Sequence, residues 1–186
     1  MLRPALDATP WLLPALVVTA LIAAATYRAV ARRLGVSRWH AVALLLTLGA
    51  IVAVTLTPSL DAGWWQRSRI ITFELPASMA ADLMRVSETS LNVALFVPLA
   101  ALVQLVERPW RGRLLVAVIA LPLAVELMQY ALPVLGRSGF QLADVAANLL
   151  GVLLGTTLGW SGARLARTQG RTATRSRPKP PLADVL

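Results

Sequence analysis

Six polar residues in the second half of the chain have side chains and spacings that suit a shared binding or catalytic site. They are Asn92, Glu126, Gln129, Arg137, Asp144 and Asn148. Two carboxylates near one arginine can act as an acid and base pair, with the arginine stabilising an oxyanion or a phosphate. The guanidinium of Arg137 also suits binding of a phosphate or carboxylate, because its planar fork donates two parallel hydrogen bonds.

The composition excludes several other chemistries. The chain contains no cysteine, which rules out disulfides, thiolate metal sites and cysteine nucleophiles. Its single histidine, His40, has no second histidine to help it bind a metal, and we interpret it as an interfacial residue beside Trp39. We expect no metal and no cofactor.

The helices that carry these residues are predicted to lie in a lipid bilayer. We therefore expect the bilayer to be the partner that contacts most of the protein surface. Of 186 residues, 57% are hydrophobic and 15% are charged, whereas a soluble domain has roughly 25% charged residues. The apolar residues form long runs of the length that a bilayer requires. The pattern predicts an all-α, polytopic transmembrane helix bundle. Its spans, about five, cover residues 10–30, 39–57, 91–106, 114–132 and 145–165.

The net charge of +9 indicates membrane orientation rather than nucleic-acid binding, and no nucleic-acid partner is expected. Basic residues cluster between spans one and two, between spans three and four, and in the tail, which together hold 13 of the 18. The positive-inside rule then places the amino terminus outside and the carboxyl terminus in the cytoplasm. Residues 58–89 become an extracytoplasmic loop, and residues 167–186 a disordered, basic cytoplasmic tail.

In this topology the polar residues gather at the extracytoplasmic helix ends. Asn92 opens span three, while Glu126 and Gln129 share a face in the last two turns of span four. Asp144 occupies the expected N-cap of span five, and Asn148 follows one turn later. With Arg137 in the preceding loop, all six can meet in the outer third of the membrane.

Each residue also has a purely structural interpretation. Asp144 can be an N-cap and nothing more, and Asn92 and Asn148 can be interhelical hydrogen-bonding residues. Glu126 and Arg137 can form a structural ion pair. Convergence from three helices favours a shared site, because ionisable residues are costly to keep within a membrane.

Two further patterns concern packing. Gly151, Gly155 and Gly159 form a stripe of small residues that allows another helix to approach closely. Span three or four of the same chain is the simplest partner, and a homo-oligomer contact is the alternative. In the long loop, an amphipathic pattern around Pro76 indicates a short helix, with a partly ordered loop as the alternative. Its apolar residues, spaced three and four apart, are Leu75, Met79, Leu83 and Val86.

The ordered set of motifs resembles the VanZ-like family. The matching segments are LTP at 56–58, LNVALFVPLA at 91–100, ELMQ at 126–129 and GRSGFQLADVAANLLG at 136–151, followed by Gly155. The family pattern places an asparagine before Phe-x-Pro-Leu, which matches Asn92, Phe96 and Pro98. Ala100 departs from it, because the family usually has glycine there. The resemblance implies that residues 1–166 form a VanZ-like transmembrane domain.

The resemblance also implies a multi-pass protein of the bacterial cytoplasmic membrane, in a family whose founding member is associated with resistance to the glycopeptide teicoplanin. One hypothesis is a non-catalytic protein that binds an envelope lipid, precursor or glycopeptide at the six polar residues and contributes to teicoplanin tolerance. The alternative is a membrane-embedded enzyme acting on a lipid-linked envelope substrate, with Glu126 and Asp144 as the acid and base.

Overall fold

The computed structural model of the chain describes residues 10–58, 70–75, 78–135 and 139–175. Helices dominate these ranges. In chain order they are α2 (Leu12–Leu34), α3 (Arg38–Leu56), α4 (Met79–Leu83), α5 (Glu88–Val103), α6 (Arg108–Ala131) and α7 (Leu142–Arg175). A 3₁₀ turn η2 (Pro133–Leu135) and two short strands, β1 (Ile70–Thr72) and β2 (Gly139–Gln141), complete the described elements.

The ends of α2 and α3 follow from local sequence. Gly35 ends α2 in the left-handed conformation, with φ of 66°, and this conformation favours glycine. Ser37 then begins α3 by accepting a hydrogen bond from the His40 backbone N–H. At the other end, Thr57 is extended because Pro58 follows it, as the sequence predicts.

The remaining helices differ from the predicted spans mainly at their ends. Ser87 and Ser90 form a capping box, so α5 begins three residues before the predicted span. Asp144 lies in the first turn of α7 and not at its N-cap, because the helix already begins at Leu142. Helix α7 also continues to Arg175, which places residues 167–175 of the predicted tail in a helix. Residues 176–186 lie outside the described ranges.

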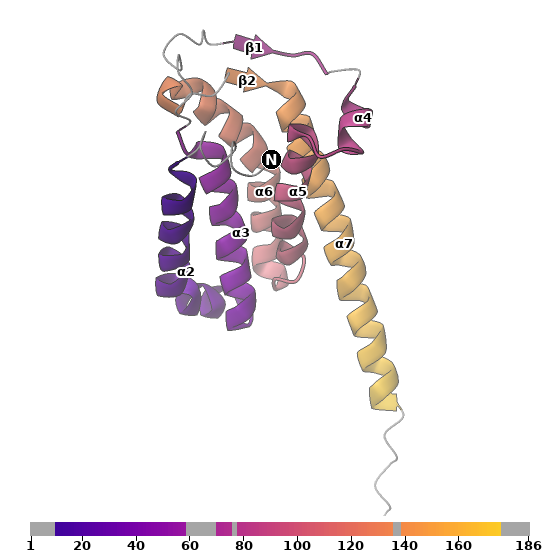
Figure 1. The fold of residues 1–186 in the computed structure, drawn as a ribbon. Coiled ribbons are helices and arrows are strands. Elements are labelled where there is room, and N and C mark those ends of the chain that lie inside the picture. Colours follow the sequence, from indigo (N-terminus) through magenta and orange to yellow (C-terminus); the bar gives the residue numbers. More distant parts are fainter. Residues whose placement is uncertain (1–9, 59–69, 76–77, 136–138, 176–186) are drawn as a thin grey trace, which may run out of the picture.

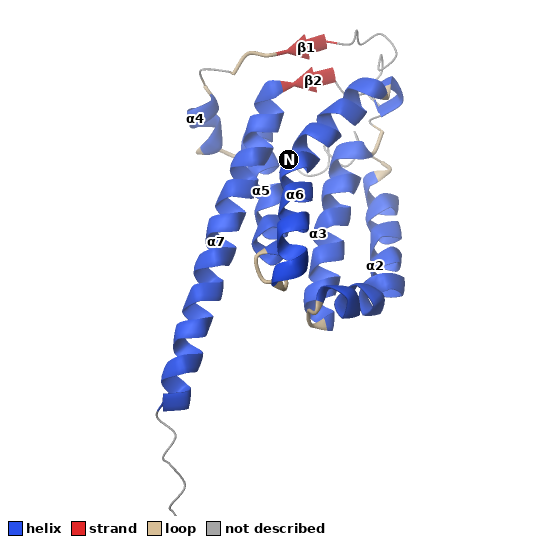
Figure 2. Ribbon diagram, turned by 180° about the vertical axis from the view of Figure 1, so that it is seen from behind, coloured by secondary structure: helices blue, strands red, loops and turns tan. Residues whose placement is uncertain are grey.

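The helices run up and down between two ends of the molecule. The α2–α3 and α5–α6 turns lie at one end, and β1, β2 and α4 lie at the other (Figures 1 and 2). The strands pair in parallel, with Ile70 opposite Gly139 and Thr72 opposite Gln141. We call the end with the two helix–helix turns the turn end, and the end with the two strands the strand end.

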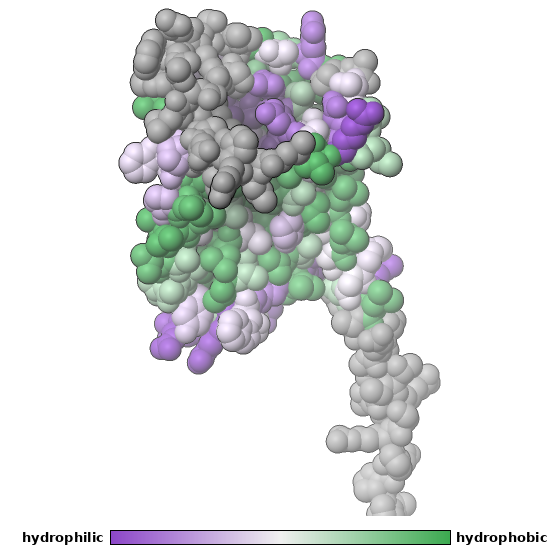
Figure 3. All heavy atoms as spheres, viewed as in Figure 1, coloured by the Kyte–Doolittle hydropathy of each residue, from purple (hydrophilic) through white to green (hydrophobic). Residues whose placement is uncertain are grey.

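The described surface has the character of a membrane protein. Helices α2, α3, α6 and residues 142–165 of α7 are each long and apolar enough to cross a bilayer. Figure 3 shows apolar residues around the middle of the molecule and hydrophilic residues towards its ends. Helix α5 has 16 residues, which corresponds to about 24 Å, so the predicted third span is shorter than the roughly 30 Å hydrocarbon core.

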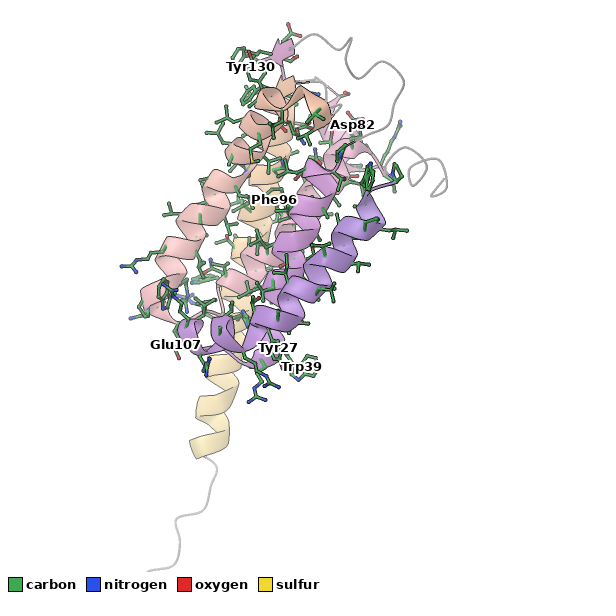
Figure 4. All side chains as sticks on the ribbon, turned by 90° about the vertical axis from the view of Figure 1, so that its left-hand side faces the viewer. Tyr27, Trp39, Asp82, Phe96, Glu107 and Tyr130 are labelled. Carbon is green, nitrogen blue, oxygen red and sulfur yellow. The ribbon has the colours of Figure 1, made fainter. Side chains whose placement is uncertain are left out.

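The core lies between α3, α5, α6 and α7. Phe96 of α5 is fully buried at its centre (Figure 4). It belongs to one cluster with Ile51 of α3, Val118 of α6 and Val152 of α7. The all-α bundle is therefore confirmed: α3, α6 and α7 pack around the shorter α5, and α2 packs against α3.

The amphipathic helix predicted after Pro76 is present but brief. Helix α4 spans five residues, Met79–Leu83. Two of the predicted apolar positions, Met79 and Leu83, are partly buried, whereas Leu75 and Val86 are exposed. A hydrogen bond from Ser87 Oγ to the Asp82 carbonyl joins the end of α4 to the start of α5.

Candidate functional site

The first contact of the candidate site joins α5 to α7. The side-chain amide of Asn92 donates a hydrogen bond of 2.9 Å to Oδ1 of Asp144. The capping box at Ser87 starts α5 four residues earlier, and Asp144 occupies the first turn of α7. A carboxylate in the first turn is favoured by the helix dipole, and hydrogen bonds to a charged acceptor are stronger than neutral ones.

The second contact joins α6 to β2. Glu126 is only 2% exposed, and its Oε2 accepts a hydrogen bond of 2.9 Å from the backbone N–H of Gln141. Gln141 is the last residue of β2 and directly precedes α7. A buried carboxylate therefore holds the chain at the point where the strand turns into the helix.

The third contact joins α6 to α3. The side-chain amide of Gln129 donates a hydrogen bond of 2.8 Å to the backbone carbonyl of Thr55. Thr55 is itself buried, and its hydroxyl donates to the carbonyl of Ile51 in the preceding turn. Thr55 lies one residue before the last residue of α3, so its carbonyl has no intrahelical partner of the usual kind.

Asn148 differs from these three residues. It is 3% exposed, and its Oδ1 has no hydrogen-bond donor. Most buried polar atoms in proteins have a partner, and an unsatisfied one destabilises the fold by about 1–3 kcal/mol. Asn148 lies one turn beyond Asp144 on α7, so this unsatisfied acceptor belongs to the same end of the bundle.

The structure thus places five of the six predicted residues near the strand end. At 1.5 Å of rise per residue, Asn92, Glu126 and Asn148 lie about 6 to 9 Å inside the ends of their helices. Two hydrogen bonds link these helices at the strand end, one from Asn92 to Asp144 and one from the Gln141 N–H to Glu126. Arg137, the sixth residue, lies outside the described ranges.

The glycine stripe faces α5. A Cβ atom added to Gly151, Gly155 or Gly159 would meet the backbone carbonyl oxygen of Val93, Val97 or Ala101, respectively. The three carbonyls are spaced four residues apart, as are the three glycines, so the two helices remain in close contact over more than two turns. This packing fixes the position of Asn92 relative to α7.

Sequence reasoning missed the partners supplied by the backbone. The Thr55 carbonyl and the Gln141 N–H carry no side-chain signal of their role, and β1 and β2 are too short to predict from three residues each. The proline at position 58 is the one available hint, because it ends α3 and leaves the Thr55 carbonyl near a helix end.

A comparison with protein families shows which family the chain belongs to. A profile of the VanZ/LLP1 family matches residues 42–163, about two thirds of the chain. The chain belongs to the VanZ/LLP1 family. All six candidate residues and the three glycines lie within the matched range of this VanZ/LLP1 protein. No curated protein and no solved structure matches the chain.

The geometry of the candidate site in this VanZ/LLP1 protein suits recognition of polar groups. The buried carbonyl of Asn148 calls for a donor such as a hydroxyl or an amide N–H. The carboxylates of Asp144 and Glu126 accept hydrogen bonds from a side-chain amide and a backbone amide, contacts that hold helix ends together. The same end of the protein therefore combines a rigid frame with an acceptor that the frame does not satisfy.

Proposed function

We propose that this VanZ/LLP1 membrane protein binds the headgroup of a lipid-linked component of the bacterial cell envelope at its strand end. The residues proposed to line the site are Asn92, Glu126, Gln129, Asp144 and Asn148, with Arg137 as the sequence-predicted contact for a phosphate or carboxylate. In this proposal the strand end faces outward from the cytoplasmic membrane, and binding alters the access of glycopeptides such as teicoplanin to the cell surface.

The single observation that carries the proposal is the unsatisfied Oδ1 of the buried Asn148. A residue retained only for packing would be better replaced by leucine, which has a similar volume and no polar atom to leave unpaired. A bound hydroxyl or amide supplies the missing donor. Binding is favoured over catalysis because Glu126 and Asp144 each accept a hydrogen bond that holds two elements together.

The test compares two buried amides at opposite ends of the bundle. Asn148→Leu should abolish binding of a lipid-linked wall precursor by the purified protein in detergent, measured by native mass spectrometry, while the protein remains folded. Gln104→Leu is the matched control, because Gln104 is 6% exposed and its Nε2 also lacks a partner, but it lies near the turn end. Equal binding by Asn148→Leu and the unmodified protein would overturn the proposal.

A cellular experiment tests the glycopeptide part separately. Expression of the unmodified protein should raise teicoplanin tolerance, and Asn148→Leu and Arg137→Ala should each remove that increase, whereas Gln104→Leu should keep it. If the purified protein binds the precursor but expression leaves tolerance unchanged, the binding function stands and the link to glycopeptides is wrong.

A further inference from the structure

The turn end carries a dense basic surface. Figure 4 shows Tyr27, Trp39 and Glu107 at this end, opposite Asp82 and Tyr130. Described arginines from α2, α3, α6 and α7 lie here: Arg28, Arg32, Arg33, Arg38, Arg108, Arg111, Arg113 and Arg164. Among the described residues of this end, Glu107 is the one acidic side chain. Such a surface attracts anions.

Two of these arginines converge on one indole. The guanidinium carbon of Arg33, in the last turn of α2, lies 5.2 Å from the centroid of a Trp110 ring. That of Arg113, in α6, lies 5.4 Å from a ring centroid of the same tryptophan. Trp110 itself is half-buried and packs against the hydrophobic core. Two like charges from different helices are therefore placed around a fixed aromatic side chain.

Neither charge of this pair has an ion-pair partner within the described part of the protein. Neither Arg33 nor Arg113 has an ion pair or hydrogen bond there, and the Glu107 carboxylate instead packs against Gly35. Other arginines nearby do have polar partners. Arg28 donates to the Tyr27 hydroxyl, and Arg111 donates twice to the carbonyl of Val106.

An apolar surface continues from Arg113 towards the middle of the molecule. Along α6, the exposed residues Val116, Ile119, Leu123 and Leu127 follow Arg113 at spacings of three and four, which places them on one face. Val116, the nearest, is 68% exposed. A phospholipid has the same order of parts, with an anionic phosphate at the surface and acyl chains extending along the apolar helix face.

We propose that Arg33, Arg113 and Trp110 form a binding site for the phosphate of an anionic phospholipid, whose acyl chains lie along the exposed face of α6. The two guanidinium groups donate hydrogen bonds to phosphate oxygens and offset the negative charge. Trp110 holds both groups in place through cation–π contacts. The site lies at the opposite end of the bundle from the envelope-ligand site and does not depend on it.

The test measures lipid binding to the full-length protein in detergent micelles by native mass spectrometry. Phosphatidylglycerol should bind more tightly than phosphatidylcholine with the same acyl chains. Arg33→Gln and Arg113→Gln should each weaken phosphatidylglycerol binding about fivefold, the change expected for loss of one arginine near an anionic surface. Arg38→Gln is the matched control, because it removes one charge from the same end but neither of the cation–π contacts to Trp110, and it should bind normally.

Three outcomes would overturn the proposal. They are equal affinity for the two lipids, equal weakening by Arg38→Gln and Arg113→Gln, and displacement of the lipid by glycerol phosphate at matching concentrations. The last outcome would show a site for free phosphate rather than for a lipid. Arg113→Lys adds a second check in a variant that keeps the charge, and it should bind less tightly than the unmodified protein because lysine lacks the planar fork. Unchanged affinity in Arg113→Lys would likewise count against the proposed geometry.

Discussion

The amide of Asn92 and the carboxylate of Asp144, 52 residues apart in the chain, are joined by a hydrogen bond of 2.9 Å. The bond ties the second turn of α5 to the first turn of α7 at the strand end, next to the stretch where the glycines bring the two helices into contact. The bond is partly buried and short, so we expect this pair to contribute to the stability of the bundle.

A double-mutant cycle should detect that contribution. Asn92→Ala and Asp144→Ala should be coupled by about 0.6 kcal/mol in the free energy of unfolding, the average for hydrogen bonds between membrane helices, and by no more than about 1.7 kcal/mol. The measurement is denaturant unfolding in mixed micelles. Asp144→Asn is the control, because it keeps an acceptor oxygen and should lose less stability than Asp144→Ala. Strict additivity of the two alanine substitutions would contradict the contact.

The glycine stripe predicts a difference between two positions on one helix. Gly155→Ala should destabilise the protein by about 1–3 kcal/mol, because the new methyl group meets the Val97 carbonyl and forces α5 and α7 apart. Gly162→Ala, also on α7, adds a methyl group with nothing within 4 Å. It should leave stability unchanged or raise it slightly, since alanine is the better helix former. Thermal unfolding of both variants in one detergent compares them, and equal effects would contradict the packing.

The Glu126 carboxylate is predicted to hold the start of α7. Glu126→Ala removes the acceptor of the Gln141 N–H within a buried site and should lower stability by about 1–3 kcal/mol. Glu126→Gln keeps a carbonyl oxygen at the same place and should lose less. Hydrogen exchange at the Gln141 amide reports directly on this contact, and it should accelerate in Glu126→Ala. Unchanged exchange there would show that the carboxylate does not protect this amide.

The orientation predicted from the charge pattern can be measured with single cysteines, because the chain has none of its own. Met84 is 87% exposed near the strand end, and Gly112 has open space around it at the turn end. A membrane-impermeant maleimide applied to intact cells should label Met84→Cys and spare Gly112→Cys. The reverse pattern would place the strand end in the cytoplasm and remove the basis for binding an envelope ligand there.

The long helices were predicted correctly from the sequence, because each corresponds to a long run of apolar residues. The lengths of the apolar runs identified α2, α3, α6 and α7, because the bilayer demands about 20 apolar residues per crossing. The predicted helix ends were less accurate where capping residues determine the first residue of the helix. The capping serines start α5 early, and Asp144 belongs to the first turn of α7 rather than to its cap.

The composition and the apolar runs thus determined by themselves that this is an all-α membrane protein. The ordered motifs added the resemblance to the VanZ-like family, and the family profile confirms it. Tertiary structure decided which polar groups meet. Asn92 pairs with Asp144, whereas Glu126 and Gln129 bind backbone atoms of Gln141 and Thr55. The physical reason is that every residue carries the same backbone donor and acceptor, so only the packing of helix ends determines which of them a side chain reaches.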